Sequence, residues 1–425
     1  MPLQDHPLRY PLVNELHARP FPTLNSPCSV AFLALKSDGP DAARDREAER
    51  AHLIDLLDRH GAPHPQPGAT HWSGEIGRHM LKWESHTEFV TYTVFTNSIL
   101  PRAFDPAEFD VFPPNWLAQA PGKRITSVLL RVEPSAGEAT VQRQIEDWFV
   151  GESLAISHAI ERDAIIAGDF RIDPAGHLRF SVFTNEGIGT RRIGRVVQRL
   201  CEIETYRAMS MLGLARVREL DPEMVRLDAE LTRLIGAMRD GATRSEETLR
   251  SLLSVSAEVE DMAAKAAYRL AATKAYEAIL RERVAMLREE RFHGRQTFVE
   301  FMMRRYDPAM RTVRASEARM AAMSPRAIRA GELLRTRVDV ERSAQNQALL
   351  ESMDRRADAQ LRLQQTVEGL SVVAISYYAV SLVGYLSYPL ADATHLSKGM
   401  LLAMITPFVV LAVWWVIRSI RKKLH

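Results

Sequence analysis

Residues Leu370–Leu390 read LSVVAISYYAVSLVGYLSYPL and contain no charged side chain. A helix of about 20 apolar residues crosses the roughly 30 Å hydrocarbon layer of a bilayer. A run of this length without a charge is typical of a segment that lies in lipid rather than in water. The stretch therefore predicts a first transmembrane helix.

A second apolar run follows closely. Residues Met400–Ile417 read MLLAMITPFVVLAVWWVI, with Trp414 and Trp415 at the end, where aromatic side chains sit at membrane interfaces. Pro407 is expected to kink this helix without preventing its insertion. Because only residues 391–399 separate the two runs, the helices are predicted to form an antiparallel transmembrane hairpin.

Basic residues on both sides of the hairpin predict its orientation. The turn carries Lys398 alone, whereas both flanking segments are basic. The positive-inside rule then places the turn outside and both termini in the cytoplasm, in a multi-pass protein of the bacterial inner (plasma) membrane. The alternative is a pair of buried core helices in a soluble protein. The flanking basic residues are Arg355, Arg356 and Arg362 before the hairpin, and Arg418, Arg421, Lys422 and Lys423 in the tail 418–425.

The composition argues against several classes of protein. The 425 residues include 55 Lys and Arg against 53 Asp and Glu, and a net charge of +2 gives no sign of nucleic-acid binding. Cys28 and Cys201 stand far apart, which argues against a zinc site or a disulfide framework and fits a reducing compartment. The start MPLQDHP lacks the features of a secretory signal, so the body is expected in the cytoplasm. No cofactor is expected.

A helical stalk is expected over residues 221–369, where Ala, Leu, Glu, Arg and Met dominate. Ser245 begins a stretch with early carboxylates, and apolar residues follow at three-four spacing as far as Leu280. This stripe predicts a helical hairpin or a coiled coil. The expected interruptions are Pro222, Pro308 and Pro325.

Ser324 and Pro325 predict the start of a further long helix, with serine as the N-cap and proline at the first helical position. Since nothing stops this helix before the first apolar run, one continuous helix is expected to reach the bilayer. A mixed polar and apolar row on it fits either the lining of a wet oligomeric axis or an ordinary surface helix. The row comprises Val338, Arg342, Gln345, Leu349, Met353, Arg356, Gln360, Leu363, Val367 and Leu370.

The N-terminal half contains an internal similarity. An extended arm is expected over residues 1–27 and an α/β domain over 28–220. Within that domain, the strand-like segments 90–97 and 178–185 alternate in polarity, and both end on Phe-Thr-Asn. Each is preceded by a strand, a helix and a second strand. A duplicated β-α-β-β unit is the economical explanation.

The two copies occupy residues 28–99 and 123–190, and a proline-rich linker, 100–122, separates them. They are predicted to pair into one mixed sheet with helices on one face, which makes the domain α+β. The other predicted strands are 28–36, 79–83, 124–132 and 164–171, and the predicted helices are 41–60 and 138–150.

A glycine-rich turn leads into the helix that follows the second copy. Gly187, Gly189 and Thr190, with Arg191 and Arg192, are candidates for binding an anion, because backbone N–H groups at a helix start favour negative charge. The spacing matches neither the dinucleotide fingerprint nor a P-loop. The favoured alternative is a tight turn capped by Thr190.

Enzymatic chemistry lacks positive support in the sequence, so the protein is not expected to be an enzyme. Glu15, His17 and Arg19 group a carboxylate, an imidazole and a guanidinium, but an extended arm that tucks these groups against the domain is the favoured interpretation. No metalloprotease, hydrolase or kinase motif is present. The remaining histidines, taken as solvated loop residues by default, are His52, His60, His64, His71, His79 and His86.

Three segments resemble a known family: NELHARPF at the start, QRLCEIETYRAM in the middle, and QLRLQQTVEGLSVVAISYY from Gln360 to Tyr378. Over essentially its whole length the chain resembles the DUF3422 family of predicted membrane-anchored bacterial proteins. That resemblance implies no reaction and no ligand.

The architecture also resembles the CorA-type divalent-cation channels, in which an α/β body, a long helix, two spans and a basic tail follow one another. This resemblance implies a homo-oligomer with a pore on its axis. Those channels end the first span with Gly-Met-Asn, whereas residues 383–388 here read VGYLSY. The candidate pore and mouth residues are Ser376, Ser381, Gly384, Tyr385 and Asp392.

The leading hypothesis is a homo-oligomeric, CorA-like inner-membrane protein whose cytoplasmic body regulates a cation pathway, with the lipid bilayer, its own copies and divalent cations as partners. The competing hypothesis is a non-conducting, membrane-anchored scaffold or ligand sensor. An enzyme that uses the group at Glu15, His17 and Arg19 or the glycine loop ranks last.

Overall fold

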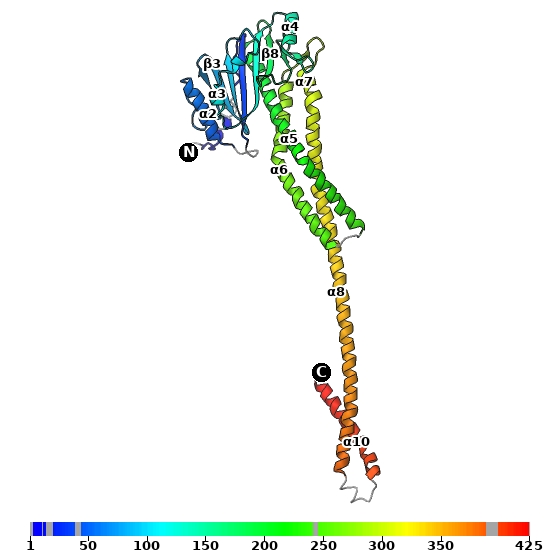
Figure 1. Ribbon diagram of the computed structural model, residues 1–425. Coiled ribbons are helices and arrows are strands. Elements are labelled where there is room, and N and C mark those ends of the chain that lie inside the picture. Colours follow the sequence, from blue (N-terminus) through cyan, green and yellow to red (C-terminus); the bar gives the residue numbers. More distant parts are fainter. Residues whose placement is uncertain are drawn as a thin grey trace. The chain divides into compact units, whose positions relative to one another are not determined.

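The chain divides into an N-terminal unit, Met1–Gly331, and a C-terminal unit, Glu332–His425, whose elements are labelled in Figure 1. In the computed structural model, residues 3–10, 12–13, 20–38, 44–240, 245–387 and 398–424 are described, with the backbone alone at 239–240, 398 and 420–424.

A mixed nine-stranded sheet forms the centre of the described part of the N-terminal unit, in the order β2-β3-β4-β1-β5-β8-β7-β6-β9. One mixed sheet was expected, and the predicted strands recur within a few residues. Three strands were missed, β2, β6 and β9. The strands are β1 (Cys28–Lys36), β2 (His71–Ile76), β3 (His79–Ser85), β4 (Phe89–Thr96), β5 (Lys123–Pro134), β6 (Ala155–Ala159), β7 (Ala164–Gly168), β8 (Leu178–Thr184) and β9 (Glu290–Arg291).

The order β-α-β-β-β occurs twice along the chain, with α2 (Arg46–Arg59) in the first half and α4 (Glu138–Trp148) in the second. The pairing of the first strand with the last strand of each half differs. β1 pairs antiparallel with β4, whereas β5 pairs parallel with β8. The two halves therefore do not share one topology, and the predicted duplication of a β-α-β-β unit is not confirmed.

The helices of the two halves, α2 and α4, cover one face of the sheet, as predicted, and the long helix that follows the second half covers the other face. In β1, Val30 and Phe32 belong to a core with α5 (Thr190–Asp240), while Leu33 belongs to a core with α2 and α4. A strand buried on both faces reads as a nearly continuous apolar run, as CSVAFLALK does. The second core also includes Trp116 of the short helix α3 (Pro114–Leu117).

Helices α5 and α6 (Ser245–Ala285) form an antiparallel pair, which confirms the helix predicted to begin at Ser245. Arg226 of α5 bonds to Glu258 of α6, and Arg199, nearer the start of α5, bonds to the carbonyl of Met286 just beyond α6. Pro222 lies inside α5 and does not interrupt it, contrary to expectation. Proline removes one backbone hydrogen bond, and the buried residues around it, Leu220, Met224 and Leu227, hold the helix in place. A coiled coil is not confirmed.

The last long helix starts earlier than predicted. Thr297 and Glu300 form a capping box for α7 (Phe298–Phe301), and a π-helical turn, Met302–Tyr306, connects α7 to α8 (Asp307–Leu386). Pro325 is therefore inside α8 and not at its start. Buried Met320 and Met323 precede this proline and buried Ala327 follows it, so packing keeps the helix continuous there. The expectation of one continuous helix up to the apolar run is confirmed.

The C-terminal unit consists, in its described part, of the rest of α8 and of α10 (Lys398–Leu424). Both helices are long and apolar enough to cross a membrane, and their apolar windows are 11% and 0% buried. The two helices touch, since a Cβ atom on Gly384 would lie 2.7 Å from Cδ1 of Leu402. Large apolar side chains such as Leu370 and Phe408 are 68% and 75% exposed.

Candidate functional site

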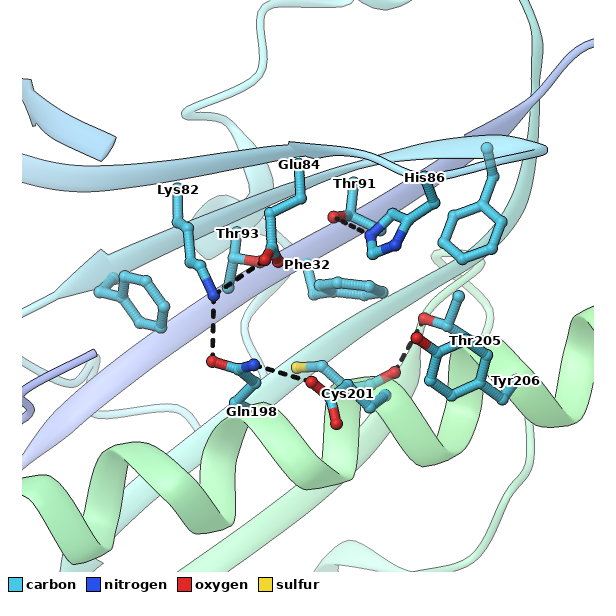
Figure 2. Close-up of a pocket in the computed structure, with 13 residues that line it drawn as sticks. Phe32, Lys82, Glu84, His86, Thr91, Thr93, Gln198, Cys201, Thr205 and Tyr206 are labelled. Carbon is cyan, nitrogen blue, oxygen red and sulfur yellow. Dashed lines mark hydrogen bonds and ion pairs between the residues drawn. The ribbon is translucent and has the colours of Figure 1, made fainter. Parts of the chain in front are cut away.

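A small polar cavity lies between the sheet and α5 (Figure 2). Strand β3 contributes Lys82 and Glu84, which are two positions apart and so point to the same face. In the antiparallel register, Thr93 and Thr91 of β4 lie opposite these two residues. Successive strands thus present four polar side chains to one helix.

A chain of hydrogen bonds connects these strands to the helices. Nζ of Lys82 lies 3.1 Å from Oε1 of Glu84 and donates to Oε1 of Gln198 at 3.0 Å. Gln198 donates in turn to Glu202 at 2.7 Å, and Arg283 of α6 donates to the other oxygen of Glu202 at 2.5 Å. Lys82 and Glu84 are 6% and 8% exposed, so their charges are compensated inside the fold.

Cys201 lines the same cavity but is not suited to nucleophilic attack. Burial raises the pKa of its thiol, and the nearby carboxylate of Glu202 raises it further. A neutral thiol is a poor nucleophile, because the thiolate is the reactive form. The hydroxyl of Thr205 donates to the carbonyl of Cys201 at 2.8 Å, a local bond within α5.

The cavity has room for water and little else. Its volume is about 30 Å³, enough for one or two water molecules. Lys82 and Glu84 are the residue types of an acid–base pair, but no organic substrate fits beside them in this conformation. The cavity residues therefore form a buried polar network that fixes β3 on α5.

A second buried cluster joins the sheet to α6. Glu88, in the turn between β3 and β4, lies 2.5 Å from Nη2 of Arg269 and accepts a bond of 3.1 Å from the hydroxyl of Tyr276. The side chains of Glu88 and Arg269 are 2% and 3% exposed. Burial, and then the charge of Glu88, raise the pKa of Tyr276, so the phenol stays protonated and donates.

One family model matches residues 4–424, and its description is protein of unknown function (DUF3422). The chain belongs to the DUF3422 family. No curated protein matches it. The segment QRLCEIETYRAM, one of the three that resemble DUF3422, is the part of α5 that supplies Gln198, Cys201, Glu202, Thr205 and Tyr206 to the cavity.

The glycine loop of this DUF3422 protein leads into the first turn of α5, and one of its two arginines is paired with carboxylates. The carbonyl of Gly189 accepts from the backbone of Ile193, so Gly189 is the N-cap and Thr190 the first helical residue, contrary to the predicted Thr190 cap. Arg192 pairs with Asp163 and with Glu161. Gly187 is exposed with φ +84°, and Arg191 is exposed. The anion site remains a prediction.

The N-terminal arm crosses the first turn of α5. A Cβ atom on Gly194 would lie 1.7 Å from the carbonyl oxygen of Pro22, so only glycine fits under the arm. Leu24 is buried and donates its backbone N–H to the carbonyl of Thr190 at 3.2 Å. The candidate group Glu15, His17 and Arg19 lies outside the described residues.

One of the histidines that were expected to be solvated loop residues is a core residue. His52 is 6% exposed, stacks on Trp116 at 3.8 Å between ring centroids, and bonds to the hydroxyl of Tyr92 and to the carbonyl of Trp116. Its position in an apolar helical pattern was the available signal. His64 and His71 are exposed as expected. Within the described ranges, no cluster of histidine, cysteine and carboxylates is suited to hold a metal.

The candidate pore residues lie on different faces of α8. Ser376 is 7% exposed, and Gly384 is buried against α10. Ser381 is half-buried, whereas Tyr385 is 69% exposed. Asp392 lies outside the described residues.

Proposed function

We propose that this DUF3422 protein is an integral membrane protein anchored by α8 and α10. The observation that carries the proposal is the exposure of both apolar windows, which are 11% and 0% buried. Core helices of a soluble protein are covered by neighbours, and surfaces as apolar as these are rare in water. The basic flanks 355–362 and 418–423 favour a bacterial inner membrane with both termini in the cytoplasm.

The helix before the membrane segment supports assembly of several copies. From Leu349 to Leu370, positions separated by steps of four and three form one stripe, the spacing of a coiled-coil seam. Every member of the stripe is exposed. A single helix with an uncovered seam is stabilised when identical helices pack on it, so the protein is a homo-oligomer in this proposal. The members are Leu349, Met353, Arg356, Gln360, Leu363, Val367 and Leu370.

In this assembly the first spans surround a common axis that passes cations, in the manner of the CorA-like architecture. A single hairpin cannot enclose water, whereas several copies around an axis can. The first span is the more polar of the two and exposes Tyr377, Tyr378 and Tyr385, each about 70%. Divalent cations are the transported ions of the proposal, and Asp392 supplies negative charge at the outer mouth.

A non-conducting scaffold or ligand sensor is the second candidate. It is favoured by the contact of Gly384 with Leu402 and by the burial of Ser376, because these small residues then close the hairpin and do not line an axis. The absence of Gly-Met-Asn from the first span points the same way. In this version, the hairpin only anchors the N-terminal unit.

Flux through reconstituted protein separates the two candidates. Purified full-length protein in liposomes that contain a divalent-sensitive dye should give a signal that rises with protein density. Empty liposomes and liposomes with heat-denatured protein are the controls. Absence of flux for every divalent cation tried rejects the channel and leaves the anchor. Recovery of the intact chain in the soluble fraction without detergent rejects both.

Thiol cross-linking tests the assembly. The native cysteines, Cys28 and Cys201, are buried, so an introduced cysteine on α8 is the accessible one. Leu363→Cys lies in the stripe and should give cross-linked oligomers with a short bismaleimide in membranes. Gln365→Cys lies on the opposite side of the same turn and should give far fewer. Equal cross-linking at both positions contradicts the seam.

A further inference from the structure

A wide groove opens in the N-terminal unit where β1 ends and β5 begins. It has a volume of about 750 Å³ and runs between these strand ends and the helices α5 and α6. Its position differs from that of the polar cavity, which lies nearer the start of α5. The groove is of the size that small-molecule sites have, about 300–1,000 Å³.

The lining of the groove is strongly basic, although the whole chain is nearly neutral. Two acidic side chains, Asp38 and Glu219, lie among the lining residues. The basic lining residues are Lys36, Lys123, Arg124, Arg216, Lys265 and Arg269. A concave surface with an excess of one charge focuses its field and raises the local concentration of the opposite ion.

Part of this positive charge is compensated by ion pairs within the fold. Lys123 pairs with Asp38, Lys265 with Asp261, and Arg269 with Glu88. Arg216 pairs with Glu219 at 2.7 Å. Subtracting these four pairs from the six basic residues leaves two charges that an added anion can neutralise.

The two remaining charges belong to Lys36 and Arg124. Among the described residues, Lys36 donates only to the carbonyl of its neighbour Ser37, at 3.2 Å, and Arg124 makes no ion pair. These two cations line the same groove on neighbouring strands, and together they suit an anionic ligand.

The groove also has an apolar side. Ile125, Leu212 and Ala215 line it together with the charged groups. The strand ends are held close to one another, since a Cβ atom on Gly122 would lie 2.6 Å from the carbonyl oxygen of Lys36. A ligand with an anionic head and a partly apolar body matches this lining on both counts.

We propose that this groove binds a small phosphate-bearing molecule. Its phosphate neutralises Lys36 and Arg124, and its body lies on Ile125, Leu212 and Ala215. Phosphate suits this donor set, because it carries up to two negative charges and several acceptor oxygens that arginine can bind in pairs. The groove lies within the N-terminal unit and has the volume of a small-molecule site, whereas nucleic acid requires an extended basic surface.

Binding to the full-length protein in neutral-lipid nanodiscs tests the proposal. The probes are inorganic pyrophosphate, ATP and the soluble lipid dihexanoylphosphatidic acid, titrated by calorimetry at low and at physiological salt. Saturable binding is expected for at least one probe and should weaken as salt rises. Binding of the nucleotide or pyrophosphate identifies a free phosphate compound as the source of the ligand, and binding of the lipid alone identifies a headgroup.

Two variants locate the bound molecule. Lys36→Gln combined with Arg124→Gln should weaken binding about tenfold, which corresponds to about 1.4 kcal/mol. Ala215→Glu places a carboxylate on an exposed helical position of the groove and should weaken binding as strongly. The matched control is Arg102→Gln with Arg143→Gln, which removes two exposed arginines outside the groove and should change affinity less than about twofold.

The proposal is overturned if none of the three probes binds saturably. It is also overturned if the control variant loses as much affinity as the groove variants, or if citrate binds as tightly as pyrophosphate. Thermal unfolding of each variant shows that it is folded before its affinity is compared. None of these outcomes depends on whether the protein conducts ions.

Discussion

Large apolar side chains are mostly buried in the N-terminal unit and mostly exposed in the C-terminal unit. In the N-terminal unit, Leu33 is 1% exposed, between two layers of helices. In the C-terminal unit, Leu370 is 68% exposed on a helix that is apolar around it. The first unit obtains its stability in water from its own packing. The second has no cover of its own in its described part, so its helices require lipid or other copies of the chain.

The ion pairs of the two units also differ in burial. Glu88 and Arg269 form a pair that is almost fully buried in the N-terminal unit, whereas Glu351 and Arg355 form a pair along the exposed surface of α8. A buried pair depends on both partners, because removal of one leaves a charge without water or counter-charge. An exposed pair is already solvated and screened. Equivalent substitutions in the two units should therefore have unequal effects.

The largest effect is expected for Arg269→Gln. The change leaves Glu88 buried and without its cation, which should destabilise the N-terminal unit by about 3–5 kcal/mol. The matched change Arg355→Gln removes an exposed pair between residues four apart and should cost about 0.3–0.5 kcal/mol. Thermal unfolding followed by tryptophan fluorescence measures both. If both variants lowered the unfolding midpoint equally, the contrast between the buried and the exposed pair would be wrong.

The sequence could predict those features of the fold that have a local signal. The apolar runs were predictable because their signal is local: 370–386 and 400–417 are helical and uncovered. The strands at Val90 and Leu178 were predictable from their alternation. Strands β2, β6 and β9 were missed: glycine interrupts β2 at Gly74, β6 has alanine at both ends, and β9 has only two residues. The start of α8 was misplaced because Pro325 is tolerated by tertiary packing, which leaves no local mark.

The candidate sites were less predictable than the fold. The polar cavity joins Lys82 and Glu84 to Gln198, more than 100 positions away, and only the parallel course of strand and helix brings them together. The groove depends on the end of β1 and the start of β5 meeting α5 and α6. The glycine loop was found from sequence, but its pairing with Asp163 was not, because that residue belongs to another turn.

Smaller effects on stability, of opposite sign, are expected when two helical glycines are replaced by alanine. Gly194→Ala should push the arm away from α5, because the new Cβ would overlap the carbonyl oxygen of Pro22. A cost of about 1–3 kcal/mol is typical of such overpacking. Gly369→Ala meets nothing within 4 Å and should favour the helix by up to about 1 kcal/mol.

Limited proteolysis gives a second readout of the arm. In Gly194→Ala, cleavage near residues 20–27 should become faster, since Leu24 loses its bond to Thr190 and its burial. In Gly369→Ala, the rate of cleavage there should match that of the unmodified protein. An unchanged arm in Gly194→Ala would show that the backbone crossing at Pro22 does not restrict this position.

The smallest effect is expected from pH, and it should again be confined to the N-terminal unit. Burial lowers the pKa of His52 and of His177 below the ordinary value of about 6.5. The unfolded chain then binds protons that the folded unit does not, so stability is complete above about pH 6.5 and decreases as the pH falls below it. No histidine occurs among the described residues of the C-terminal unit. The unfolding midpoint of the N-terminal unit should fall as the pH is lowered from 7.5 to about 5.5. Cross-linking through Leu363→Cys should not change over this range when it is compared at equal thiolate reactivity. A midpoint that rises on acidification would contradict the lowering of these two pKa values by burial.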